Sequence, residues 1–397
     1  MFVFLAALLT YALLSFGGVV RQSWFALELL WIAGVAALLV IRVARHRSLD
    51  RSLLGFLIFC GIVLALVPAK LGVGFLAAGW AYLSARAADS GVLRFFHFLL
   101  LLGVLEALLG LTQYFFAPGW ILGYINPFYR SSGTLINRNH FAGLLEMFIP
   151  VAFGLAYLSA RRFGNMARVY VYLLAGAFMG LALLFSVSRM GIFSFLATAC
   201  FMGMVLQFRK SHRGLAAGLE LGLVGLIVAG ALWIGVDVIV QRFSEIAGEE
   251  AILREGRVTV FRDAIRMIAA NPSGVGTGNF QDRYRQFQTL HPELLFDHTH
   301  NDYLETAAEW GLPLALAFWT FLLYVVVRGV RLFVSIDSSE QRGILLTCTG
   351  AAFSILIHSL ADFNLQIPSN AMLFFTFIGI SLAMPLPGKE QATDLAD

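Results

Sequence analysis

Long runs of apolar residues, separated by short joints, fill most of this 397-residue chain. Hydrophobic side chains make up 59% of the sequence and charged ones only 13%, which is more apolar surface than a water-soluble core can bury. Backbone groups in lipid must be hydrogen-bonded within the chain, so the runs must be helices. We therefore predict an all-α polytopic membrane protein with about twelve transmembrane helices. They are expected at residues 2–20, 24–41, 52–68, 71–85, 93–116, 138–159, 169–187, 191–207, 215–236, 311–330, 343–362 and 370–387.

Basic residues follow every even-numbered helix, which predicts the orientation of the chain because short cytoplasmic joints are rich in Lys and Arg. The clusters are Arg42, Arg45, Arg47 and Arg51; Arg86 and Arg94; Arg161, Arg162 and Arg168; Arg209, Lys210 and Arg213; and Arg328, Arg331 and Arg342. Both termini are then cytoplasmic. The joints at 117–137, 188–190, 237–297 and 363–369 face the other side, where no ATP or NAD pool exists.

One joint is far longer and more polar than the rest. Residues 237–297 hold nine acidic residues and seven Arg. We accordingly divide the chain into nine helices at 1–236, an outer loop domain at 237–310, and three helices with a short cytoplasmic tail at 311–397. The net charge of +4 reflects the basic cytoplasmic joints, so we expect no nucleic-acid partner. The three Cys lie inside apolar runs, which predicts neither disulfides nor a thiol metal site. The first run lacks a charged leader and a cleavage site, so we expect a first span rather than a removed signal.

Two polar groups stand at helix ends on the outer side. The segment 129–140 ends in Arg138, Asn139 and His140 at the start of a helix, where Asn139 is the expected N-cap and a helix N-terminus with Arg favours an anion. An ordinary cap with interfacial anchors explains it equally well. The second group is Ser186-Val-Ser188-Arg189. An Arg at the membrane boundary usually has a partner, and snorkelling to the surface is the alternative.

A third group lies in the loop. Arg262 and Arg266 are spaced i,i+4, while Val258, Phe261 and Ile265 share a neighbouring face. The pattern predicts an amphipathic helix at the membrane surface with Arg directed to a phosphate-bearing partner, or simply a solvated charged face. The glycines at 274, 276 and 278 are expected to form the turn after this helix.

The fourth group is the run Asp-His-Thr-His-Asn-Asp-Tyr-Leu-Glu at 297–305. A helix should begin here and stop at Gly311 before Pro313. His-x-His beside carboxylates can bind zinc, but no third His has useful spacing and no Cys is near. A His acting as general base is the better functional reading, and a structural pair remains the alternative. His358 and Asp362 are spaced i,i+4 and could support this site, while Glu28, Glu106 and Glu146 are candidate polar contacts in the bundle.

Taken together, these motifs resemble the O-antigen ligase and polymerase superfamily of membrane glycosyltransferases. The resemblance rests on Ser-Gly-Thr-Leu-Ile-Asn-Arg-Asn-His-Phe-Ala-Gly at 132–143, Ser-Val-Ser-Arg-Met-Gly at 186–191, Arg262 with Asn-Pro-Ser-Gly-Val-Gly-Thr-Gly-Asn-Phe at 271–280, and His-Thr-His-Asn-Asp-Tyr-Leu-Glu at 298–305. It spans roughly residues 130–315, and the predicted topology fits over the full chain.

The resemblance implies a glycan donor on undecaprenyl pyrophosphate, an active site on the periplasmic side of the bacterial inner membrane, and a large periplasmic loop containing amphipathic helices. By motif, Arg189 and Arg262 match the arginines that bind the pyrophosphate, and His300 matches the residue that activates the acceptor hydroxyl. The role of His298 is open. We expect substrate contacts from Arg138, His140, Arg266, His298, Asn301 and Tyr303 as well.

The chemistry needs no metal and no cofactor, because the leaving group already carries the energy. Guanidiniums stabilise the departing pyrophosphate, a His takes the acceptor proton, and attack opposite the leaving group inverts the anomeric centre. An O-antigen ligase, which acts on a lipid A-core acceptor, is slightly preferred to a polymerase, which joins one glycan to another. A relative that acts on a Ser of a protein would need the same donor site and stays open.

A lipid-linked glycan transporter is the alternative from another class, although no internal repeat supports it. A scaffold for polysaccharide assembly proteins is weaker. The acceptor is expected at 241–257 and 281–297. These segments mix Arg242, Arg254, Arg283 and Arg285 with Glu249, Glu250 and Glu293. The Arg residues would suit a phosphorylated acceptor, while Tyr284, Phe287 and Tyr303 would stack on a neutral one.

Overall fold

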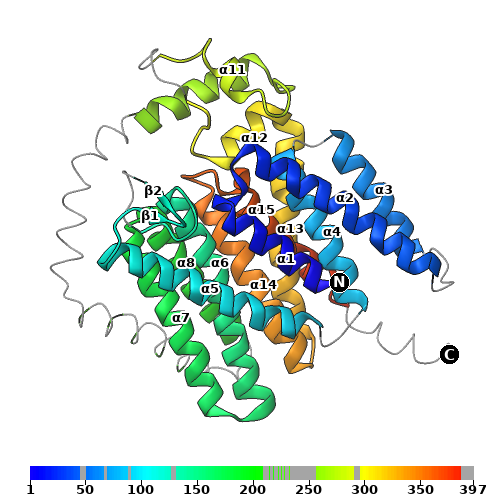
Figure 1. Ribbon diagram of the computed structural model, residues 1–397, viewed down its shortest axis with the longest axis vertical. Helices are drawn as coiled ribbons and strands as arrows, with labels where there is room; N and C mark the ends of the chain where they lie inside the picture. Colours follow the sequence, from blue (N-terminus) through cyan, green and yellow to red (C-terminus); the bar gives the residue numbers. More distant parts are fainter. Residues whose placement is uncertain are drawn as a thin grey trace.

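The computed structural model describes residues 1–44, 51–66, 69–87, 91–126, 131–208, 256–289 and 296–385, with six further single positions between 214 and 232. Within them the chain is mostly helical, as the apolar runs predict (Figure 1). Six of the described helices are long and apolar enough to cross a membrane. The expected total of twelve stays a prediction, because most of 215–236 lies outside the described residues.

The helices fall close to their predicted bounds. In chain order they are α1 (Phe2–Leu14), α2 (Arg21–Ala44), α3 (Arg51–Leu66), α4 (Ala69–Ala87), α5 (Gly91–Phe115), α6 (Arg138–Leu158), α7 (Met166–Ser186), α8 (Arg189–Gln207), α11 (Phe280–Tyr284), α12 (Asp302–Trp310), α13 (Leu312–Ser335), α14 (Ser339–His358) and α15 (Pro368–Ala383). Short 3₁₀ turns η1 (Phe16–Gly18) and η4 (Asn364–Gln366) and a π turn η2 (Ser159–Phe163) connect some of them.

The first helix is shorter than the run 2–20 predicts. α1 stops at Leu14 because Gly17 and Gly18 adopt φ of +78°, where the chain turns and packs against Pro368 and Ile367 at the start of α15. A small departure from an all-helical chain lies between α5 and α6. There β1 (Trp120–Ile121) and β2 (Tyr124–Ile125) pair as a two-residue-turn hairpin.

The centre of the bundle is α6, which is buried from His140 to Leu158. It packs on α7, α14, α5 and α8, while α15 packs most extensively on α4. Small residues allow these close approaches, as is usual between membrane helices. A Cβ on Gly154 of α6 would collide with Thr347 of α14, and one on Gly379 of α15 would collide with the backbone of Ala78.

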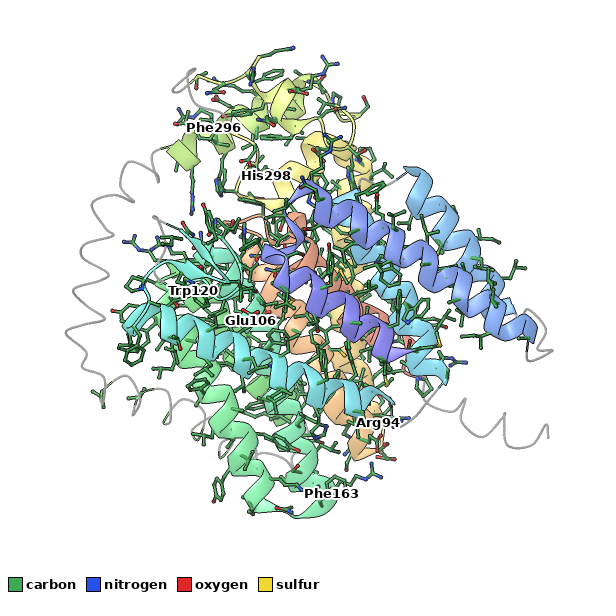
Figure 2. The ribbon with its side chains drawn as sticks, viewed as in Figure 1. Arg94, Glu106, Trp120, Phe163, Phe296 and His298 are labelled. Atoms are coloured by element: carbon green, nitrogen blue, oxygen red, sulfur yellow. The ribbon has the colours of Figure 1, made fainter. Side chains whose placement is uncertain are left out.

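A second, smaller hydrophobic cluster lies beyond one end of the bundle, near α11 and α12 in Figure 1. It joins the helical residues 256–270, α11 and α12 through Val260, Ala264, Met267, Ile268, Phe280, Tyr284, Ala307 and Ala308. His298 lies at this end, and Arg94 and Phe163 lie at the other (Figure 2).

Candidate functional site

The site begins in the turn that precedes α12. Asn301 caps the helix, because its side chain accepts a hydrogen bond from the Leu304 N–H at 3.0 Å. Glu305 reaches back and accepts the Thr299 N–H at 2.9 Å, and the Thr299 hydroxyl donates to the Asn301 carbonyl at 2.7 Å. These bonds hold His300 between them at φ +55°, a left-handed conformation that costs about 1–2 kcal/mol for a residue with a side chain. Such strain is typical of functional positions.

The two histidines of this turn have different partners. Nδ1 of His298 lies 2.6 Å from the Glu305 carboxylate, and its ring stacks on Phe363. Nδ1 of His300 instead faces the Asp362 carboxylate at 3.7 Å, with its ring edge against the same Phe363. The His300 side chain is 27% exposed and that of His298 only 12%. His300 is therefore the more accessible imidazole, and His298 is the more firmly held.

Asp362, in the connection between α14 and η4, collects three imidazoles. Besides His300, Nε2 of His140 lies 3.6 Å from it and Nε2 of His358 lies 3.8 Å from it. These separations exceed ordinary hydrogen-bond lengths, so the attraction is electrostatic and leaves room for adjustment. Burial alone would raise the pKa of Asp362, but the surrounding imidazoles outweigh it and hold that pKa well below its ordinary value. The site thus contains a fixed negative charge behind His300.

His140 comes to Asp362 from the first turn of α6. The helix begins at Arg138 and its cap is Asn137, whose side chain accepts the Asn139 N–H at 2.8 Å. The expectation that Asn139 is the cap is therefore wrong by two residues. The His140 carbonyl accepts a bond from Asn370 of α15 at 2.9 Å, which ties the start of α6 to α15. Arg138 is half-buried, two residues before His140.

The motif at 186–191 forms the tight turn between α7 and α8. Val187 has φ +54°, which is unfavourable for a β-branched residue, and Ser188 caps α8 by accepting the Gly191 N–H at 3.2 Å. Arg189 is the first residue of α8 and is exposed. Gly191 lies against α6, where a Cβ would come within 2.6 Å of Ala142 and 3.1 Å of the Glu146 carboxylate. The first turn of α8 therefore lies directly on α6.

Arg262 and Arg266 lie on the helical stretch 256–270, as predicted, and not on the elements that carry the histidines. Arg262 is exposed, and Arg266 lies 3.4 Å from Asp263 on its own helix. Asp263 is buried and accepts bonds from the Thr289 N–H and hydroxyl at 2.8 and 2.9 Å. Val258 and Ile265, the apolar face expected from the sequence, are exposed. The buried face instead carries the cluster residues Val260, Ala264, Met267 and Ile268.

The glycine-rich segment after this helix forms the predicted turn. Gly274, Gly276 and Gly278 all have positive φ, and the Gly276 N–H donates to the Glu309 carbonyl at 3.0 Å. The Glu309 side chain accepts the Phe280 N–H at 3.2 Å. Burial, followed by the neighbouring Glu305, raises the pKa of Glu309 to about 7. The segment therefore serves to join the smaller cluster to α12.

Two aromatic residues expected at an acceptor surface have structural contacts instead. Tyr284 is fully buried in the smaller cluster. Tyr303 donates its hydroxyl to the Leu356 carbonyl at 2.7 Å, and its ring stacks on Trp319. Arg283 and Arg285, on either side of Tyr284, are exposed. Other residues expected near the acceptor, among them Arg242, Arg254 and Glu293, lie outside the described residues, as do Tyr129 and Arg130.

Asp362 and Glu146 lie closer to the site than the sequence predicts. The sequence indicates Asp362 through its spacing from His358, and Glu146 as a carboxylate in an apolar run. Nothing in the sequence indicates that they meet through His358, whose Nδ1 lies 2.8 Å from Glu146. Chemically, the arrangement offers a partly exposed imidazole backed by a buried carboxylate. Arg138 begins the helix that carries His140, and Arg189 begins α8, whose first turn lies on that helix.

Part of the chain matches one family of known proteins. Residues 174–319 match the family model described as O-antigen ligase, a stretch that contains Arg189, Arg262, His298 and His300. This confirms the resemblance of the chain to the O-antigen ligase and polymerase superfamily. No curated protein matches the chain.

Proposed function

We propose that this multi-pass membrane protein transfers a glycan from an undecaprenyl-pyrophosphate donor to an acceptor hydroxyl, without metal or nucleotide, on the periplasmic face of a bacterial inner membrane. The acceptor oxygen attacks the anomeric carbon, and its proton passes to His300. The bond from that carbon to the pyrophosphate oxygen breaks, with its electron pair, so the anomeric centre is inverted.

The observation that carries the proposal is the environment of His300. Its Nδ1 faces Asp362, which favours the tautomer with the proton on Nδ1 and leaves Nε2 as the basic nitrogen. When Nε2 takes the acceptor proton, the new imidazolium lies beside a carboxylate that is already ionised. General-base catalysis of this kind typically contributes about 10²–10⁴-fold to a rate.

The donor pyrophosphate is assigned to Arg189 and Arg262. Arg189 lies at the N-terminus of α8, where the partial positive charge of the helix adds to that of the guanidinium. Arg262 is exposed on a helix of the smaller cluster, so closure of that cluster over the donor would bring in the second guanidinium. Arg138, His140, Arg266, His298, Asn301 and Tyr303 are proposed to line or support the same site.

The test is glycan transfer by purified protein in liposomes, with the lipid extract of a strain that lacks the gene as the source of donor. We expect Arg189→Ala, Arg262→Ala and His300→Ala each to lose turnover, while Arg331→Ala at the other end of the bundle keeps it. Full turnover in all three site variants would refute the proposal. Activity is expected to persist in EDTA, and loss on chelation with rescue by zinc would refute metal independence.

The acceptor is proposed to be lipid A-core, as for a ligase, in slight preference to a second glycan, as for a polymerase. Of the residues expected near the acceptor, Arg283 and Arg285 are exposed and Tyr284 is buried, which suits a phosphorylated acceptor better than aromatic stacking. The double variant Arg283→Ala/Arg285→Ala should then weaken acceptor use, and Arg283→Lys/Arg285→Lys should retain most of it.

Mass analysis of surface glycans in the deletion strain separates the two acceptors. Long glycans left on the polyprenyl carrier would identify a ligase, and single repeat units on the core would identify a polymerase. Normal glycans with normal attachment would contradict both.

A further inference from the structure

Behind the site lies a buried ion pair that the proposed chemistry does not use. Glu146 of α6 and His358 at the end of α14 are both buried, and 2.8 Å separates the carboxylate oxygen Oε1 from Nδ1. Burying two charged groups is costly, so an arrangement of this kind is weak evidence for stability by itself. The contacts of this pair with Asp362 and with α8 indicate a role other than stability.

The positions of two carboxylates around its ring indicate that His358 is protonated. Nδ1 faces Glu146 at 2.8 Å, and Nε2 faces Asp362 at 3.8 Å. A neutral imidazole has a single N–H and would turn a lone pair toward one of the two carboxylates. An imidazolium has two N–H groups and suits both. His358 is therefore a cation held between two anions.

The net charge of Glu146, His358 and Asp362 then influences how readily His300 takes up a proton. Glu146 and Asp362 contribute two negative charges, and His358 contributes one positive charge. The group is thus one proton short of neutrality in a region of low dielectric, which favours proton uptake. His300 is the most exposed of the three imidazoles, so the acceptor's proton arrives there.

The other charged groups around this cluster are accounted for. Asp302 of α12 is bonded to the Ser359 hydroxyl at 2.7 Å, and burial raises its pKa well above the ordinary value, so it adds little charge. His298 is paired with Glu305. From α8 the group that meets Glu146 is Gly191, together with the Ser194 hydroxyl.

We propose that Glu146 and His358 are positioning residues that set the proton affinity of His300 through Asp362. They hold Asp362 ionised and directed toward His300, and neither touches substrate. Glu146 also lies beneath the first turn of α8, so one side chain supports both the base and the helix that begins at Arg189. This inference rests on the proposed role of His300 as general base.

The test is the pH dependence of turnover in three variants, measured in liposomes with the donor extract described above. Glu146→Gln removes one negative charge, so His300 should hold a proton less tightly and the acidic limb should move to lower pH. His358→Gln removes the positive charge, so the limb should move to higher pH. Each shift is expected to be on the order of one pH unit. Glu146→Gln/His358→Gln removes the pair as a neutral unit and should return the limb close to its original position.

A purely structural role predicts something else. Loss of turnover with the limb unmoved in both single variants, or equal shifts in the same direction, would overturn the inference. Monodispersity and melting temperature in detergent show whether each variant is folded, and the double variant is the form most able to fold without the pair. If His300→Ala keeps turnover, the proposed role of His300 as general base fails, and this inference fails with it. If His300→Ala abolishes turnover and the limb stays fixed in the other variants, this inference alone fails.

Discussion

Glu106 and Asp362 are both buried carboxylates, but their surroundings differ in one respect. Both oxygens of Glu106, on α5, accept hydrogen bonds from Thr134, at 2.7 Å from the hydroxyl and 3.0 Å from the N–H. Nearby, the Gln113 side chain accepts the Ser132 and Gly133 N–H groups at 2.9 Å. The loop before α6 is thus fixed by bonds of ordinary length.

Asp362 is less completely bonded. Its Oδ1 accepts the Phe363 N–H at 2.9 Å, but the three imidazole nitrogens that face the carboxylate lie 3.6–3.8 Å away, and Oδ2 has no hydrogen-bond partner within the described part of the chain. A fully hydrogen-bonded carboxylate stabilises one conformation of its surroundings. A carboxylate with one oxygen unbonded can form a stronger interaction when a neighbouring imidazole gains a proton. Glu106 is therefore bonded as a structural carboxylate, whereas Asp362 is the one that we propose supports His300.

The largest effect should follow from removing the base. His300→Ala is expected to lower turnover by about 10²–10⁴-fold, because no other exposed imidazole lies beside Asp362 in the described residues. His97→Ala is the matched control. His97 is an exposed histidine bonded to Leu93 and Tyr172, one turn from Arg94 at the other end of the bundle. Equal losses in the two variants would mean that His300 acts only through folding.

The next effect comes from exchanging a carboxylate for an amide at the site. Asp362→Asn keeps the shape of the side chain but removes the charge that stabilises the His300 imidazolium. Turnover should fall on the order of 10²-fold, less than in His300→Ala because the imidazole itself remains. Donor binding should change little, which single-turnover and binding measurements can separate from chemistry. An unchanged rate would remove Asp362 from the mechanism.

Glu309 offers a smaller effect on stability. Its pKa in the folded protein is about 7 against 4.5 for an ordinary Glu, so the folded state holds the proton more tightly than the unfolded state. The stability due to this group is complete below about pH 4.5 and is lost as the pH rises through about 7. Glu309→Gln should therefore raise the free energy of unfolding at pH 8 by on the order of 2 kcal/mol and flatten its pH dependence. A melting series in detergent from pH 4.5 to 8 measures this, and a pH dependence that is unchanged in the variant would contradict it.

The smallest effect should come from the same carboxylate-to-amide exchange at Glu106. In Glu106→Gln the amide oxygen can still accept the Thr134 N–H, and the Thr134 hydroxyl can rotate to accept from the amide. We expect a loss of about 1 kcal/mol in stability and nearly unchanged turnover. A hundredfold loss of turnover here, equal to that of Asp362→Asn, would break the distinction between the two acids.

Sequence reasoning was strongest where a single physical requirement decides the outcome. Apolar runs such as 169–187 had to be helices because lipid offers no hydrogen-bond partners, and α7 (Met166–Ser186) follows. It was weaker where two choices have similar energy. The stretch 256–270 has two apolar stripes, and only its packing on α11 and α12 decides that Val260 and Met267 are the buried ones.

The sequence did not predict the parts of the site that depend on contacts between distant parts of the chain. His298 and Asp302 are spaced for an i,i+4 pair, yet His298 pairs with Glu305 because the turn before α12 places it beside that carboxylate. The meeting of His140, His300 and His358 at Asp362 joins α6, the turn before α12 and α14. Local spacing contains no information about such a meeting.

The pairing of Glu146 with His358 also has a consequence for how the protein is made. The two residues are 212 positions apart, so at about 5–20 residues per second α6 is synthesised roughly 10–40 s before its partner exists. During that interval the insertion machinery must deliver a helix with an uncompensated carboxyl group, which enters lipid most cheaply with its proton on. Arrival of α14 then draws the proton from Glu146 and locks two late-meeting helices together. Chains that end before α14 keep an unstable sixth helix, which should make them preferred substrates for membrane proteases.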